Sequence, residues 1–129
     1  LKNEDSLSWS TDDDNKIEKT YCCVNAVARD FAKLGRLMLN EGKWDQTQII
    51  SENWFKESTN FDTLNGSTGI YKHQWWKGVL DEGDYAAQGL NGQYIYLFPN
   101  KNLMIIRLGD GYGDEKNWMA LMASISKTL

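Results

Sequence analysis

The sequence predicts an α+β fold in which an antiparallel β-sheet is flanked by helices. Apolar residues recur at helical spacing in the first half of the chain, and short apolar strands separated by turn residues fill much of the second half. The 129 residues, 41% hydrophobic and 25% charged, have the composition of an ordinary globular protein. We expect one domain over residues 1–129, mainly helical over 1–68, with strands and a closing helix over 69–129.

Two helices are expected before residue 69. Four apolar residues recur at the spacing of one helix face: Val27, Phe31, Leu34 and Met38. They predict an amphipathic helix from about Asn25 to a stop at Gly42. A second, shorter helix should begin at Ser51, whose hydroxyl can cap the first turn, and carry Trp54 and Phe55.

The second half predicts a sheet and a closing helix. The expected strands are Ile70–Lys77, Tyr85–Gly89, Gln93–Phe98 and Leu103–Leu108. A turn over Pro99–Asn102 should make the last two strands antiparallel neighbours. One face of the closing helix is expected to hold Trp118, Leu121, Met122 and Ile125, which can cover the sheet.

Charge and composition argue against several partners. The net charge of −4 is spread along the chain without a basic stripe, so nucleic acid is not expected as a partner. Gly109, Gly111 and Gly113 are spaced wrongly for a dinucleotide loop, and we expect no cofactor and no metal.

The only two cysteines, Cys22 and Cys23, are adjacent in the sequence. Their Cα atoms should therefore lie closer together than the usual Cα–Cα distance across a disulfide, so we expect free thiols.

Three further patterns are weak candidates for chemistry. Ser124–Lys127 spells S-x-x-K, but it forms the last turn before the chain ends, where helices fray, so an ordinary polar helix end is expected. The sole histidine, His73, is expected as a strand residue without a catalytic partner nearby in sequence. The six tryptophans are expected mainly in the core, although a carbohydrate platform is an alternative.

The informative stretch is Tyr85–Phe98, YAAQGLNGQYIYLF. One strand runs into Gly89, a short loop follows, and a second strand begins at Gln93. Glycines permit close backbone approach, and a strand edge can present an unpaired N–H to a ligand oxygen. That is the element with which acyl-transfer enzymes bind an oxyanion. A β-hairpin with glycine bulges would have the same pattern.

Four segments together carry a family resemblance: NAVARDFAKLGRLMLNEGKW (25–44), QIISENWFKEST (48–59), YKHQWW (71–76) and AAQGLNGQYIYLFPNKNLMIIRLGDG (86–111). They resemble the β-lactamase-related serine hydrolases, which include class C β-lactamases and penicillin-binding proteins, and especially their 6-aminohexanoate-dimer hydrolase branch. The resemblance implies the C-terminal portion of a β-lactamase/transpeptidase-like fold. It also implies hydrolysis of a small-molecule amide or ester.

The resemblance assigns roles to residues of this stretch. Ala87, Gln88 and Gly89 stand at the positions of the family's K-T-G strand, and the backbone N–H of Leu90 then completes the oxyanion hole. Ala87 and Gln88 lack the cation and hydroxyl that hold a β-lactam carboxylate, which argues against penicillin recognition. Asn91 stands where the amide-hydrolase branch has a histidine.

Asn91, Gln93 and Trp75 are the expected substrate contacts. The family's nucleophilic S-x-x-K serine and lysine have no counterpart here, so we expect them upstream in a longer protein and this chain alone to be inactive. The missing N-terminal portion would be its partner, and an exposed sheet edge could support self-association.

Such a parent could be periplasmic or membrane-anchored. The alternative is a non-catalytic binding module with a tryptophan-rich sheet.

Overall fold

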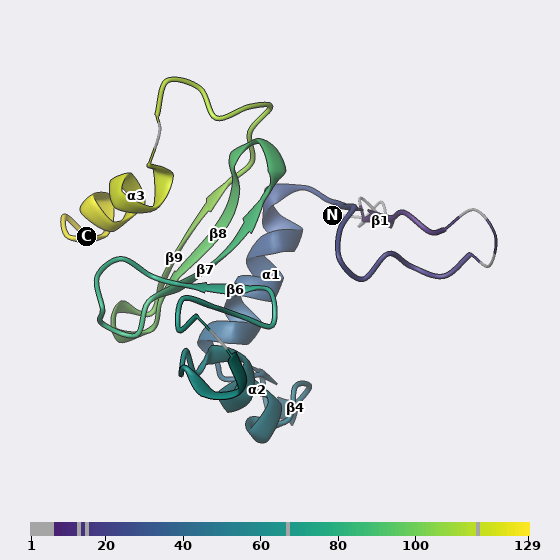
Figure 1. The fold of residues 1–129 in the computed structure, drawn as a ribbon, viewed down its shortest axis with the longest axis horizontal. Helices are drawn as coiled ribbons and strands as arrows, with labels where there is room; N and C mark the ends of the chain where they lie inside the picture. Colours follow the sequence, from purple (N-terminus) through teal and green to yellow (C-terminus); the bar gives the residue numbers. More distant parts are fainter. Residues whose placement is uncertain (1–6, 13, 15, 67, 116) are drawn as a thin grey trace.

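The computed structural model describes residues 7–12, 14, 16–66, 68–115 and 117–129. Its centre is a five-stranded antiparallel sheet in the order β5-β6-β7-β8-β9, so each strand pairs with its neighbour in sequence (Figure 1). The strands are β5 (Tyr71–Lys72), β6 (Trp75–Lys77), β7 (Tyr85–Gly89), β8 (Gln93–Phe98) and β9 (Leu103–Arg107). The expected α+β fold with an antiparallel sheet is confirmed.

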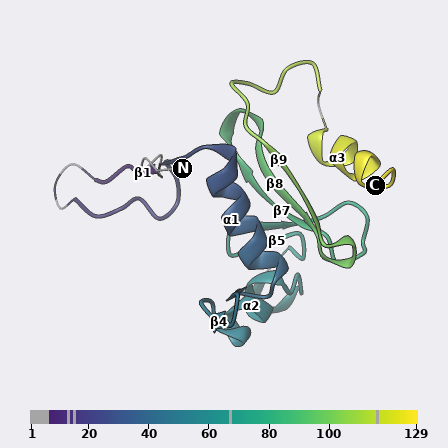
Figure 2. The same ribbon diagram turned by 180° about the vertical axis from the view of Figure 1, so that it is seen from behind.

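Helices cover both faces of the sheet. Helix α1 (Ala28–Leu39) crosses one face, helix α3 (Trp118–Ser126) lies on the other, and α2 (Glu52–Thr59) packs beyond the end of α1 (Figures 1 and 2). The alternation of side chains along each strand divides the core between these faces. On the α1 side Tyr85 and Leu97 are buried with Met38, and on the α3 side Ala86 and Tyr96 are buried with Met122. None of the described helices is long and apolar enough to cross a membrane.

Helix α1 lies close to the sheet because Gly35 is one of its two buried residues. A Cβ at Gly35 would stand 2.9 Å from Met104 Sδ of β9 and 3.4 Å from Ile95 of β8. The hydroxyl of Ser51 accepts a hydrogen bond from Trp54 N–H at 3.3 Å, so the expected cap of α2 is confirmed. Val27, expected on the buried face of α1, precedes the helix and is 52% exposed.

The expected single strand Ile70–Lys77 is wrong. Its centre is a tight reversal at His73 and Gln74, which have φ values of 45° and 71°, so β5 and β6 form a hairpin. Histidine tolerates the left-handed conformation better than most residues, and two central residues with positive φ match the twist of a two-residue hairpin turn. His73 is therefore a turn residue and not a strand residue.

The inner face of α3 also differs from the expected face. Met119, Met122, Ala123 and Ser126 are the buried residues. Leu121 and Ile125 are 38% and 43% exposed, so they lie on the outer face. Apolar residues surround most of this short helix, and their spacing alone did not identify which face the sheet would cover.

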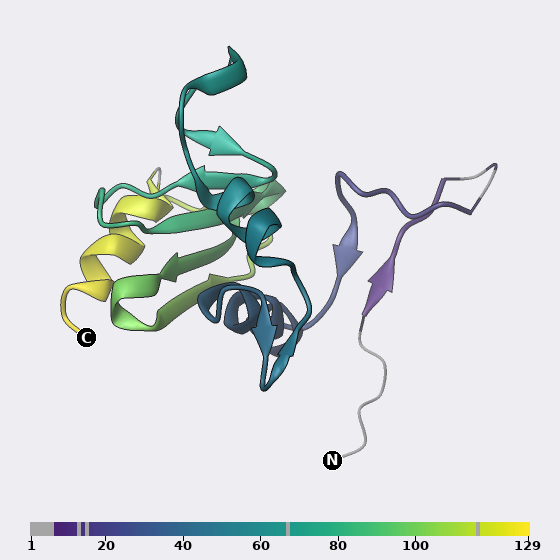
Figure 3. The ribbon, with the colours of Figure 1, turned by 90° about the horizontal axis from the view of Figure 1, so that it is seen from below.

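The described residues between 7 and 25 (7–12, 14 and 16–25) form an arm that projects away from the sheet (Figures 1 and 3). Strands β1 (Ser8–Trp9) and β2 (Val24–Asn25) pair in antiparallel register at its base. Cys22 and Cys23 are joined by a disulfide, so the expectation of free thiols is wrong. The adjacent Cα atoms lie 3.7 Å apart, below the usual range, but Cys23 adopts a φ of 75°, part of a turn in which the neighbouring sulfurs meet.

A short hairpin and three 3-10 turns complete the described chain. Strands β3 (Lys43–Trp44) and β4 (Thr47–Gln48) form a hairpin between α1 and α2. Single 3-10 turns occupy Leu64–Gly66, Leu90–Gly92 and Pro99–Lys101. The last of these, followed by Asn102 in the left-handed conformation, provides the expected reversal between β8 and β9.

Candidate functional site

Strand β7 has a neighbour on both sides along only part of its length. Strand β6 pairs with Tyr85 and Ala86 only, whereas β8 pairs with all five residues of β7. In the described part of the chain, no strand pairs with residues 87–89 on the β6 side. The second half of β7 is therefore open along one edge.

The hydrogen-bond pattern shows which backbone groups face this open edge. Gly78 N–H donates to the Asp84 carbonyl oxygen at 2.7 Å across the β6 side. Because backbone groups of successive strand residues point to alternate sides, those of Gln88 face the same way as those of Asp84. Gly89 is extended, with φ −117° and ψ 168°, so the next N–H, that of Leu90, also points toward the open edge.

The turn between β7 and β8 holds Leu90 at the surface. Leu90–Gly92 forms one 3-10 turn, in which Asn91 (φ 60°) and Gly92 (φ 74°) are left-handed. Gly89 pairs with Gln93 across the base of this turn. The Leu90 side chain is 79% exposed, so its apolar surface has no packing role in the described structure.

Arg107, at the end of β9, ties the turn to the chain segment that follows β9. Its Nη1 donates to the carbonyl oxygens of Gly92 and, at 3.3 Å, Asn91. Its Nη2 donates to the carbonyl oxygen of Gly111 at 2.9 Å. The guanidinium also lies over the ring of Trp118, with Cζ 3.9 Å from the ring centroid.

The side chain of Gln93 joins the same two segments. Its Nε2 donates to the Gly109 carbonyl oxygen, and its Oε1 accepts from Gly109 N–H at 3.0 Å. Both ends of the amide are thus engaged with backbone. Gln88 points to the α3 face, where its Nε2 lies 2.8 Å from Met119 Sδ.

The structure brings most of the predicted site residues together. Those that meet at the open end of β7 and its turn are Gln88, Gly89, Leu90, Asn91 and Gln93. Trp75 lies elsewhere, 8% exposed in the core beneath α1, with its ring edge-on to Tyr85 at 5.2 Å. This placement leaves little of its surface for a substrate.

The S-x-x-K tetrad lies in the last turn of α3 and beyond it. Ser126 is fully buried and donates to the Ala123 carbonyl oxygen at 2.8 Å, whereas Ser124 and Lys127 are exposed. This is the environment of a polar helix end.

His73 contacts an ion-pair network beside α2. Its ring packs against that of Trp54 in a tilted arrangement, with centroids 4.7 Å apart, and its Nε2 lies 3.8 Å from Glu57 Oε1. Lys72 Nζ lies 2.9 Å from Glu57, and the hydrogen bond between them lowers the pKa of Glu57 and raises that of Lys72. Because the Glu57 side chain is 55% exposed, we interpret this network as a surface feature that joins α2 to the β5–β6 hairpin, although the Lys72 side chain is only 16% exposed.

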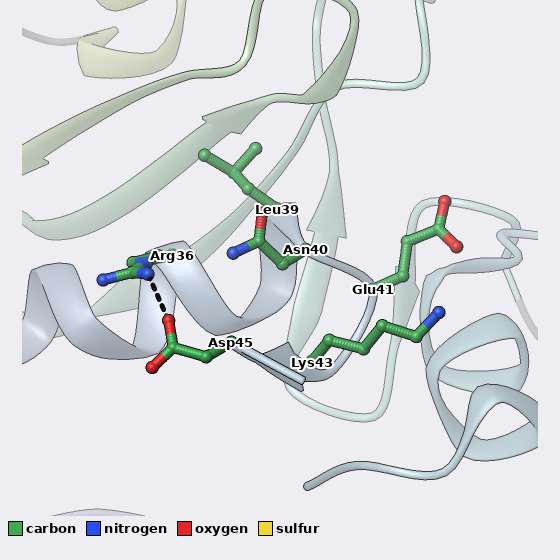
Figure 4. A pocket seen from close by; sticks show the side chains of 6 residues that line it. All are labelled: Arg36, Leu39, Asn40, Glu41, Lys43 and Asp45. Carbon is green, nitrogen blue, oxygen red and sulfur yellow. Dashed lines mark hydrogen bonds and ion pairs between the residues drawn. The ribbon is translucent and has the colours of Figure 1, made fainter. Parts of the chain in front are cut away.

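A shallow pocket lies at the C-terminal end of α1 (Figure 4). Its charged lining includes Arg36 and Asp45, whose Nη2 and Oδ1 atoms form an ion pair at 3.0 Å. The lining residues contain no hydroxyl, thiol or imidazole that could serve as a nucleophile or base. Within the described ranges, no three His, Cys, Asp or Glu side chains gather as a metal site would require.

Arg107 is the residue of this site that the sequence analysis missed. Its hydrogen-bond acceptors are backbone carbonyl oxygens, which any residue type can supply. The one feature in the sequence that indicates Arg107 is a pair of glycines, Gly92 and Gly109, because a Cβ at either position would meet the guanidinium. Gly109 is also one of the three glycines whose spacing does not fit a dinucleotide loop.

Comparison with known proteins finds relatives of this chain in sequence and in fold. No family model matches the chain. The 6-aminohexanoate-dimer hydrolase of Paenarthrobacter ureafaciens is 29% identical over 113 residues, which cover 79% of this chain and 29% of that protein.

Two solved structures share the fold. A Bacillus anthracis protein assigned as a 6-aminohexanoate-dimer hydrolase is 26% identical and matches with a TM-score of 0.74 over 93% of this chain and 32% of its own. A Bacteroides dorei protein assigned as a β-lactamase matches with a TM-score of 0.59 at 9% identity, over 93% of this chain and 45% of its own. The chain thus spans about a third of the length of the first two proteins. The chain is thus similar in sequence and fold to β-lactamase-related serine hydrolases and covers only part of the length of the proteins it matches.

Proposed function

We propose that this chain contributes the oxyanion-binding strand of a serine hydrolase that acts on amide or ester bonds. The observation that carries the proposal is the open edge of β7, toward which the Leu90 N–H points. The nucleophilic serine and its lysine lie in a part of the parent protein that precedes residue 1. The name of the Paenarthrobacter relative, a hydrolase of a 6-aminohexanoate dimer, favours a small linear amide as substrate.

The chemistry assigns a backbone role to the turn. When the serine oxygen adds to the substrate carbonyl, negative charge develops on the carbonyl oxygen, and a fixed N–H donor stabilises it. Ala87 and Leu90 carry no functional group, so this stabilisation must come from the backbone of the strand and turn. The Asn91 side chain is exposed beside it and can contact the leaving group or acyl chain.

The Gly89→Val substitution in the full-length enzyme tests the donor. A Cβ at position 89 would lie 3.0 Å from Gln93 Cβ, so valine should crowd the base of the turn and shift the Leu90 N–H. Losing one oxyanion donor costs about 3 to 4 kcal/mol, so kcat on a short p-nitrophenyl ester should fall on the order of a hundredfold. Thr47→Val, on the exposed strand β4, is the matched control and should leave kcat unchanged.

Folded Gly89→Val enzyme with near-normal turnover would show that Leu90 is not the donor. Asn91→Ala should instead change the ratio of amide to ester turnover, because its side chain does not form the oxyanion hole. Measuring both substrates with each variant separates the two effects.

The upstream nucleophile has its own test. The coding sequence before residue 1 should contain S-x-x-K on a predicted helix, on the order of a hundred or more residues earlier, given ordinary domain sizes. A fluorophosphonate probe should label the full-length protein at that serine and should not label the 129-residue chain stoichiometrically. Labelling of the short chain that disappears in Ser124→Ala would overturn the assignment.

A further inference from the structure

The guanidinium of Arg107 donates hydrogen bonds to the backbone of the Leu90–Gly92 turn, which carries the proposed oxyanion donor. Two of its hydrogen bonds end on the carbonyl oxygens of Asn91 and Gly92, one and two residues after Leu90. A third ends on Gly111, in the segment that leads to α3. In the described part of the chain, no acidic side chain lies at ion-pair distance from Arg107, so its positive charge is not cancelled by a nearby carboxylate.

The surroundings are shaped to hold the guanidinium in place. A Cβ at Gly92 would come 2.5 Å from Nη1, and a Cβ at Gly109 would overlap the guanidinium. Trp118 supports the group from the α3 side, and its own Nε1 donates to the Tyr112 carbonyl oxygen at 2.9 Å. Two close glycine backbones, one aromatic face and three carbonyl acceptors therefore fix a single side chain.

This arrangement has two consequences for the turn. First, a planar donor group that bridges two segments fixes their separation more firmly than a single flexible ammonium can. Second, an unpaired cation on the carbonyl side of Asn91 and Gly92 makes the potential around the turn more positive, which favours an anion forming at Leu90 N–H.

We propose that Arg107 is a positioning residue for hydrolysis, holding the Leu90–Gly92 turn so that the Leu90 N–H points at the developing oxyanion. This inference rests on the function proposed above and adds a residue that does not itself touch the substrate. Because the Leu90 N–H acts in the transition state more than in substrate binding, losing Arg107 should lower kcat and leave KM nearly unchanged.

The test uses three variants of the full-length enzyme. Arg107→Ala should lower kcat on a p-nitrophenyl ester by about 10- to 100-fold, the cost of a small misplacement of a catalytic group. Arg107→Lys keeps the charge but loses the planar fork, and its kcat should fall between those of Arg107→Ala and wild type. Arg36→Ala is the matched control, since Arg36 also stacks on a tryptophan (Trp44, 4.5 Å) and pairs with Asp45 far from the turn.

Chemical rescue separates positioning from general structural damage. Added guanidinium at concentrations that do not unfold the protein should restore part of the kcat of Arg107→Ala and none of that of Gly89→Val. A rise in KM with unchanged kcat, or equal loss in Arg107→Ala and Arg36→Ala, would overturn the inference while leaving the proposed function intact.

Amide exchange gives a readout that does not depend on activity. Hydrogen–deuterium exchange of the peptide covering residues 88–93 should become faster in Arg107→Ala and stay unchanged in Arg36→Ala. If wild-type enzyme shows no hydrolase activity and no probe labelling, the proposed function fails and the catalytic role of Arg107 fails with it. If wild type is active but exchange at 88–93 is unaltered by Arg107→Ala, the turn does not depend on Arg107 and only this inference is overturned.

Discussion

Asp84 is a buried acid that organises the start of the site strand. It is 3% exposed, and its Oδ2 accepts from the Tyr96 hydroxyl at 2.5 Å and from Leu80 N–H at 3.2 Å. Its Oδ1 accepts from Glu82 N–H at 3.2 Å, while the Tyr96 oxygen accepts from Val79 N–H at 3.0 Å. Burial, together with the bond to Asp84, raises the pKa of Tyr96. The side-chain hydrogen bonds of Asp84 and Tyr96 thus hold the loop that leads into β7.

Tyr96→Phe should destabilise the protein by about 1 to 3 kcal/mol, because it leaves Val79 N–H without its acceptor and removes one of the two hydrogen bonds to Asp84 Oδ2. Tyr85→Phe is the comparison: its hydroxyl makes one long bond, 3.3 Å, to the Met38 carbonyl oxygen, and its loss should cost less. Urea unfolding of both variants measures the difference. An equal or smaller loss in Tyr96→Phe would mean that the Asp84 network is not a main source of order in this loop.

At the scale of elements, the sequence predicted the strands whose residue pattern and flanking turns are distinctive. Tyr85–Gly89 and Gln93–Phe98 match β7 and β8. The aromatic and β-branched residues that favour strands lie mainly in β8, which is bounded by a glycine turn and a proline turn. The β5–β6 reversal was missed because its turn residues, His73 and Gln74, are not the usual Asn-Gly pair. Arg107 could not be predicted for a different reason: its acceptors are backbone atoms of residues 91 and 92, which only the β8–β9 register brings within reach.

The contact between α1 and the sheet depends on Gly35. Gly35→Leu should destabilise the protein by about 1 to 3 kcal/mol, since a side chain there must displace Met104 and Ile95 in a packed core. Leu34→Ala, one position earlier and 41% exposed, should change stability by only about 0.5 kcal/mol or less. Thermal and urea unfolding of the two variants measure this contrast. Near-equal free energies of unfolding for Gly35→Leu and Leu34→Ala would show that α1 can move away from the sheet to accommodate the leucine.

At the scale of the whole molecule, the sheet ends in strands with unpaired outer edges. Strand β9 pairs only with β8 among the described strands. Because successive residues direct their backbone N–H and C=O groups to opposite sides, those of Met104 and Ile106 point away from β8, toward the free edge. An unprotected edge can pair with another chain. In a longer parent protein, the same edge is where a further strand could add.

We therefore expect the 129-residue chain to self-associate through β9. Sedimentation velocity over the micromolar range should give a mass above the 14.8 kDa of one chain. Ile106→Pro removes an outward N–H without breaking a β8–β9 bond and should reduce association if the chain stays folded by circular dichroism. A concentration-independent monomer would contradict the open-edge interpretation.

The projecting arm of residues 7–25 has a practical consequence for handling the protein. Lys16 is exposed and Lys19 half-buried in a hairpin held by two short strands and by the bonds from Trp9 Nε1 to the Lys19 and Cys22 carbonyl oxygens. Such segments open locally long before the body unfolds, and trypsin cleaves after lysine. Brief digestion should therefore cut the arm first and leave a resistant product that contains α1, the five-stranded sheet and α3. Mass spectrometry of that product would define the minimal unit for crystallisation trials and for the exchange measurements.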